Sequence, residues 1–121
     1  MSVIHKNPPA KTEEVGEFIA SLGYTIPLDF VKIMSESNGM DVETVDYDFT
    51  VWPLDEILSL NKEYHVEEFA PDFILLGTDG GGMALAMEKM TAELYAIPFI
   101  GFQKSDGQFL AKNFTEFLAL E

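Results

Sequence analysis

The stretch that decides the fold is PDFILLGTDGGGMALAM, residues 71–87. An apolar run at residues 73–76 is followed by Asp79 and three glycines, and then Met83, Leu85 and Met87 alternate with alanines. Short apolar runs favour strands, and glycines permit the positive φ angles of a tight turn. A phosphate-binding loop would instead continue into a helix, usually with lysine and serine or threonine after the glycines. We therefore expect a β-hairpin over these residues.

Two short helices are predicted upstream of this hairpin. The apolar residues of the first helix recur with helical spacing, at Val15, Phe18, Ile19 and Leu22. The second follows Pro27 and ends before Gly39, with its buried stripe at Phe30, Ile33 and Met34. Neither helix is long enough to be stable alone, so both must pack on other elements.

The remaining elements complete an α+β pattern. Residues 49–52 alternate as a strand, and Pro53 ends that strand and begins a third helix. Further strands are expected at 94–100 and 109–111, and Asn113 with Glu116 has the spacing of a capping box that opens a last helix. We predict N-terminal helices packed on a mainly antiparallel sheet, with a C-terminal helix. The expected core residues are Phe18, Phe30, Ile33, Leu76, Leu85, Ile97 and Phe117.

Length and composition limit the possible functions. The 121 residues fit one domain over 1–121, in which residues 1–11 are expected to be flexible. The chain has no cysteine, which excludes disulfides and thiolate chemistry and suits a reducing cytoplasm. We also expect no signal peptide and no membrane span. The net charge of −14, with lysine as the only strongly basic residue type, makes direct nucleic-acid binding improbable.

The acidic residues are concentrated in one part of the chain. Residues 41–72 contain ten carboxylates and one lysine, a net charge of −9. Such a field speeds association with a basic partner, although acidic surfaces also serve solubility alone. Tyr47, flanked by two aspartates, is either an anchor for a basic pocket or a plain exposed loop residue. The candidate partner-binding residues are Asp41, Glu43, Asp46, Tyr47, Asp48, Glu63, Glu67 and Glu68.

Other site chemistries find little support in the sequence. His65 with Glu67 and Glu68 could begin a divalent metal site, but the one other histidine, His5, lies near the N-terminus, and zinc sites need three or four converging ligands. No serine lies in a nucleophile-elbow pattern. We expect no catalytic residues, no metal and no cofactor, and a hydrolase using two carboxylates remains only as a marginal alternative.

The order of the motifs resembles the SUKH superfamily, in particular its branch named after a fungal cell-wall-assembly regulator. The resemblance covers approximately residues 13–118. Each matching motif is weak alone, and the order and spacing together are fairly specific. The matching motifs are IPLDF at 26–30, SNG at 37–39, VWPLDEI at 51–57, the asparagine at 61, PDFILLGTDGGG at 71–82 and NFTEFL at 113–118.

The resemblance implies a function as well as a fold. It implies an α+β domain with no known catalytic residues, and many bacterial members of the superfamily look like immunity proteins that neutralise toxins delivered between cells. The leading hypothesis is therefore an acidic inhibitor that masks a basic surface of a toxin, such as a nuclease. The alternative, suggested by fungal relatives, is a regulatory or scaffold module that binds an endogenous protein. The oligomeric state is not predicted.

Overall fold

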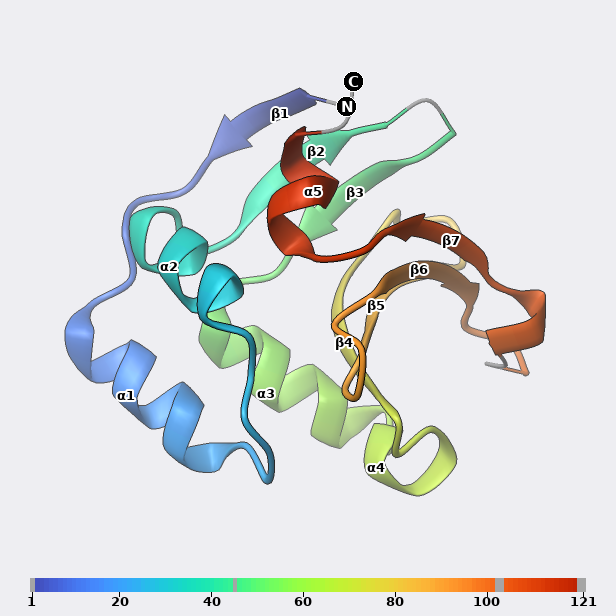
Figure 1. Ribbon diagram of the computed structural model, residues 1–121, viewed down its shortest axis with the longest axis horizontal. Helices are drawn as coiled ribbons and strands as arrows, with labels where there is room; N and C mark the ends of the chain where they lie inside the picture. Colours follow the sequence, from blue (N-terminus) through green and yellow to red (C-terminus); the bar gives the residue numbers. More distant parts are fainter. Residues whose placement is uncertain (1, 45, 102–103, 120–121) are drawn as a thin grey trace.

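The computed structural model describes residues 2–44, 46–101 and 104–119, and Figure 1 shows their arrangement. None of the helices within these ranges is both long enough and apolar enough to cross a membrane. In chain order the elements are β1 (Ser2–Lys6), α1 (Thr12–Ser21), α2 (Leu28–Glu36), β2 (Met40–Glu43), β3 (Asp48–Val51), α3 (Leu54–Glu63), α4 (Val66–Phe69), β4 (Phe73–Thr78), β5 (Met83–Glu88), β6 (Leu94–Pro98), the 3-10 turn η1 (Lys104–Asp106), β7 (Gln108–Ala111) and α5 (Phe114–Ala119).

The described strands form one antiparallel sheet whose spatial order is the order of the sequence, β1 to β7. The sheet is strongly curled, and the helices gather against it (Figure 1). Helix α3 contacts β4 and α1, whereas α2 contacts α5, which also contacts β1 and β7. The predicted α+β architecture, with N-terminal helices, an antiparallel sheet and a C-terminal helix, is confirmed.

The glycine-rich segment is the predicted hairpin turn. Strands β4 and β5 pair on either side of it, so the phosphate-loop alternative is wrong. The Asp79 carboxylate accepts hydrogen bonds from the backbone N–H groups of Gly81 (2.7 Å) and Met83 (3.0 Å). Gly80 and Gly82 have φ angles of +75° and +107°, which only glycine adopts without strain. The aspartate and the glycines therefore fix this turn together.

The core contains six of the seven residues that the sequence predicted. Phe18, Phe30, Leu76, Leu85, Ile97 and Phe117 are buried. The exception is Ile33, which is only half-buried, because α2 turns Phe30 and Met34 toward the core and leaves Ile33 at the margin of its apolar stripe. The phase of a short helix is set by its neighbours, and the spacing of three apolar residues cannot fix it.

Two strands were not expected from the sequence. Ser2–Lys6, within the segment expected to be flexible, form the edge strand β1, which pairs with β2. Met40–Glu43 form β2 itself, and β2 pairs with β3 in turn. Residues of the acidic segment therefore belong to regular secondary structure, and the sheet fixes which way their side chains face.

Three residues of the family motifs hold the elements together. Asn38 Oδ1 accepts a hydrogen bond from Leu54 N (2.8 Å) and so caps α3 from outside the helix. Asn61 on α3 accepts from Leu75 N and donates to the Leu75 carbonyl, both at 2.8 Å. Gly77 lies so close to β3 that an added Cβ would be 2.0 Å from the Thr50 carbonyl oxygen. The structural role of each is therefore evident from its contacts.

Candidate partner-binding surface

The structure separates the eight candidate partner-binding residues into two groups. The hairpin group lies on β2, on β3 and in the turn between them, and consists of Asp41, Glu43, Asp46, Tyr47 and Asp48. The helix group lies at the end of α3 and on α4, and consists of Glu63, Glu67 and Glu68. In Figure 1 the strands β2 and β3 lie in the upper part of the view, whereas helix α4 lies at the bottom. The acidic segment therefore forms two surfaces.

The hairpin group takes its orientation from the alternation of the strands. Met40, Val42, Phe49 and Val51 face inward and are buried. The alternate residues face outward, where Asp41 pairs with Thr50 and Glu43 with Asp48. Thr50 Oγ1 donates a hydrogen bond to Asp41 Oδ1 (3.0 Å). The outer face of this hairpin is therefore a fixed array of carboxylates.

Glu43 and Asp48 form an unfavourable pair within that array. They lie directly opposite each other across β2 and β3, both are exposed, and neither makes an ion pair within the described residues. Like charges at directly opposed positions of an antiparallel pair destabilise it by about 0.2–1 kcal/mol. The fold thus retains a repulsion that a neutral or basic residue would remove.

Tyr47 is held in place by hydrogen bonds and a ring contact within the domain. Its backbone N–H donates to Thr44 Oγ1 (2.8 Å), and its ring lies 5.3 Å from that of Phe49, measured between centroids. Its hydroxyl donates to Gln108 Oε1 on β7 (3.2 Å), and Gln108 Nε2 donates to Asp46 Oδ2 (3.4 Å). Tyr47 is half-buried as a result. Tyr47 is therefore not a plain exposed loop residue, and its role as an anchor for a basic pocket stays a prediction.

The helix group surrounds a sharp change of chain direction. Between α3 and α4, His65 adopts the left-handed conformation, with φ of +55°. Glu67 Oε1 accepts a hydrogen bond from Lys89 Nζ at 2.6 Å, while the Glu68 carboxylate lies 3.9 Å from His65 Nδ1. Glu63 is exposed. Across the described ranges, no three or more histidine, aspartate or glutamate side chains converge as metal ligands would.

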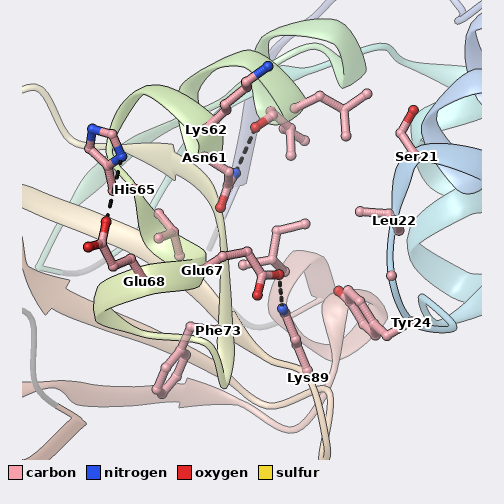
Figure 2. Close-up of a pocket in the computed structure, with 15 residues that line it drawn as sticks. Ser21, Leu22, Tyr24, Asn61, Lys62, His65, Glu67, Glu68, Phe73 and Lys89 are labelled. Carbon is pink, nitrogen blue, oxygen red and sulfur yellow. Dashed lines mark hydrogen bonds and ion pairs between the residues drawn. The ribbon is translucent and has the colours of Figure 1, made fainter.

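A cavity of about 610 Å³ opens beside the helix group (Figure 2). Its walls come from the loop between α1 and α2, from α3 and α4, and from the ends of β4 and β5. Ile57, Leu58, Val66 and Ile74 supply apolar wall, and Tyr24 and Lys89 supply polar groups on one side. Glu67 and Glu68 from the acidic segment also line it.

Sequence reasoning did not identify Tyr24 or Lys89 as site residues. Tyr24 follows Gly23 in a connection between two helices, and nothing in that pattern indicates a site. Lys89 carried a usable signal, since it is the only strongly basic residue among residues 63–103. The cavity itself depends on three distant segments meeting, which periodicity does not reveal.

Comparison with protein-family models identifies a family that matches the chain. The family described as "SMI1 / KNR4 family (SUKH-1)" matches residues 9–120, which is nearly the whole chain. No curated protein matches the chain significantly. The family includes immunity and regulatory proteins and is generally non-catalytic. The resemblance stated from the motifs is confirmed by this match.

Proposed function

The chain belongs to the SMI1/KNR4 family (SUKH-1), and from that membership we propose that it is a non-enzymatic, acidic protein-binding domain that acts as an immunity protein. Its target is a toxin with a basic surface, such as a nuclease, and it acts in the cytoplasm. Inhibition is steric and electrostatic: carboxylates of the domain occupy the place that phosphates would take on the toxin.

The observation that carries this proposal is the outward-facing hairpin group. Glu43, Asp46 and Asp48 are exposed, and Glu43 opposes Asp48 although the pairing is unfavourable. A cationic partner would neutralise these two carboxylates. Relief of the repulsion between Glu43 and Asp48 would then contribute to the free energy of binding. Residues that are destabilising in the free fold are often those that function requires.

The helix group offers a weaker surface for the same partner. Glu67 is already neutralised by Lys89, and His65 lies beside Glu68. A basic partner would have to compete with Lys89 for the Glu67 carboxylate. We therefore assign the main contact to the hairpin group and a secondary contribution to Glu63 and Glu68.

The test begins with a pull-down from a lysate of the source organism, with the wild-type domain as bait, followed by mass spectrometry. Association rates of the captured protein are then measured at low and high salt for three triple variants. The hairpin variant is Glu43→Gln, Asp46→Asn, Asp48→Asn, and the helix variant is Glu63→Gln, Glu67→Gln, Glu68→Gln. The control is Glu13→Gln, Glu17→Gln, Glu36→Gln, in which three exposed carboxylates of α1 and α2 lose the same charge.

We expect the hairpin variant to associate about tenfold more slowly than wild type at low salt, with a difference that shrinks as salt rises. The control should slow association much less. Equal slowing by the hairpin and control variants would reject the hairpin group as the recognition surface. Expression of the captured protein then separates two roles: growth arrest relieved by the domain supports immunity, and no arrest supports the alternative of a regulatory module.

A further inference from the structure

The hydroxyl of Tyr24 is a buried polar group without a partner. Its Oη is inaccessible to solvent and makes no hydrogen bond with any residue that the structure describes. Buried hydroxyls are nearly always hydrogen-bonded, because leaving one unpaired costs the free energy of its lost hydration. Figure 2 shows the hydroxyl directed toward the Lys89–Glu67 pair at the cavity wall. Such a hydroxyl is free to take a hydrogen-bond partner from outside the chain.

Lys89 adds further donors at the same corner. Its side chain is only 17% exposed, and its ammonium nitrogen lies 5.2 Å from the centroid of the Tyr24 ring. Of the three N–H bonds of that ammonium, the described residues use one, in the 2.6 Å hydrogen bond to Glu67. Two N–H bonds and the phenol therefore remain to meet an acceptor.

The phenol acts as a donor throughout the physiological range. Burial, with a smaller contribution from the negative charge of Glu67, raises the pKa of Tyr24 from 10.0 to about 12. The hydroxyl is consequently protonated at neutral pH, and a ligand oxygen can accept its hydrogen. A carboxylate has two such oxygens and would also compensate the Lys89 charge.

The other features of the cavity limit the ligand further. Its volume of about 610 Å³ is that of a small-molecule site, and Ile57, Val66 and Ile74 provide apolar wall. The net charge of −14 opposes a simple anion, while Lys89 opposes a simple cation at this corner. The exposed carboxylates of Glu67 and Glu68 can accept hydrogen bonds from an ammonium group.

We propose that this cavity binds a small zwitterion of the α-amino-acid class with an apolar side chain. The ligand carboxylate accepts from Lys89 Nζ and, once side chains at the cavity wall shift to expose it, from Tyr24 Oη. The ligand ammonium group donates to Glu67 and Glu68. The opposite charges of Lys89 and Glu67 are adjacent, as are those of an α-amino acid. The ligand has no net charge, so it is repelled neither by the negative net charge of the domain, as an anion would be, nor by Lys89, as a cation would be. This binding is distinct from the main protein contact, because the hairpin group takes no part in it, although Glu68 belongs to both the cavity lining and the secondary protein contact.

Three related probes test the proposed class by calorimetric titration of the wild-type domain. L-phenylalanine has both charged groups, 3-phenylpropionate lacks the ammonium, and 2-phenylethylamine lacks the carboxylate. We expect L-phenylalanine to bind and each analogue to bind at least about tenfold more weakly, since each analogue keeps only one of the two charged contacts and adds a net charge to the site. L-leucine serves as a second apolar amino acid. The proposal is overturned if neither amino acid binds, or if either analogue binds as tightly as L-phenylalanine.

Tyr24→Phe distinguishes a binding role from a structural one, because it removes only the unpaired hydroxyl. The free variant should melt a few degrees above wild type, since a buried unsatisfied group is lost. It should nevertheless bind L-phenylalanine about tenfold more weakly. The control is Tyr64→Phe, at a tyrosine that is 47% exposed and lies outside the cavity, and it should change neither property.

Lys89→Met is a second variant, which keeps the length of the side chain and removes its charge. It should also weaken binding of L-phenylalanine by about tenfold or more, because the ligand carboxylate loses its charged partner. Two results would overturn the proposal. One is a Tyr24→Phe variant that melts below wild type, and the other is wild-type affinity for L-phenylalanine in either variant.

Discussion

The strands β2 and β3 differ from the strands β4, β5 and β6 in how many of their faces are covered. In β2 and β3 one face is buried and the other carries exposed carboxylates. In β4 to β6 both faces are covered, and residues 73–77, 84–87 and 94–97 are all buried. Strands covered on both sides read as continuous apolar runs, whereas one-sided strands alternate. Burial, and with it stability, is concentrated in the covered strands, while the open strands have a free face for recognition.

This comparison assigns different consequences to substitutions in the two regions. Changes in the covered strands, at their junction with β3 or in the helical layer should cost stability. Changes on the open face should affect stability little and partner binding strongly. Chemical denaturation of single variants is the measurement that decides each case below.

The largest loss of stability is expected at Gly77, where the covered strand β4 pairs with the open strand β3. Gly77→Ala places a Cβ 2.0 Å from the Thr50 carbonyl oxygen of β3, so the backbone of one strand must move. We expect the free energy of unfolding to fall by about 5 kcal/mol or more, which is the whole stability of many small domains. Gly81→Ala is the matched control, because its nearest contact would be an ordinary 3.6 Å to the Asp79 side chain. If the two variants are equally stable, the close approach of β3 and β4 is not obligatory.

The next effect concerns the helical layer. Phe30 on α2 is fully buried, with its ring 4.9 Å from that of Phe114 on α5 and 6.1 Å from that of Phe18, measured between centroids. Phe30→Ala should lower the free energy of unfolding by about 3–5 kcal/mol through the cavity it leaves. Leu28→Ala, on the same helix but 83% exposed, should change it by less than about 0.5 kcal/mol. A loss below about 1 kcal/mol for Phe30→Ala would show that α2 contributes little to the core.

A smaller loss of stability is expected from substitution of Asn61, which joins α3 to β4 by hydrogen bonds to the backbone of Leu75. Asn61→Ala leaves the N–H and the carbonyl of Leu75 without their side-chain partner. We expect a loss of about 2–3 kcal/mol, because buried backbone groups are left unpaired. Lys62→Ala, at the exposed neighbouring position, provides the comparison and should be nearly neutral. Equal stability of both variants would mean that water replaces the amide at β4.

The smallest effect has the opposite sign. Glu43→Lys converts the repulsive pair with Asp48 into an attractive one, and we expect a gain of about 0.5 kcal/mol that decreases with added salt. The same change at Glu13, on the exposed side of α1, controls for the general reduction of net charge. The Glu43→Lys domain should be more stable than wild type and yet bind its partner less well. A loss of stability at Glu43 would show that its carboxylate is compensated in the fold.

Periodicity predicted the parts of the fold that are locally determined. Phe18, Phe30 and Phe117 each lie in the apolar stripe of a different helix, and the aspartate and glycines of 79–82 specify their own turn, so local sequence was sufficient there. Strand β2 is only four residues long. Its residues form a strand with alternating buried and outward-facing side chains because they pair with β1 and β3. Pairing partners of that kind are tertiary information, which short alternating segments do not contain.

The candidate site was predicted less completely than the fold. Charge counting located the acidic segment, but whether Asp48 and Glu67 share a surface depends on the path of α3, which carries them apart. The pairing of Lys89 with Glu67 joins residues 22 positions apart, and the unpaired hydroxyl of Tyr24 results from burial by distant segments. Neither feature has a local signature.

The sequential order of the sheet has a consequence for how the domain is made. Because every strand pairs with the one synthesised before it, the sheet can grow in the order of translation. Two contacts cannot form that early: Tyr47 with Gln108, 61 residues apart, and Asp29 with Thr115, 86 residues apart. We therefore expect a ribosome-bound intermediate in which β2 to β6 are paired while Tyr47 has not yet formed its hydrogen bond to Gln108. The carboxylates of the hairpin group acquire their final positions only when β7 and α5 have left the ribosome.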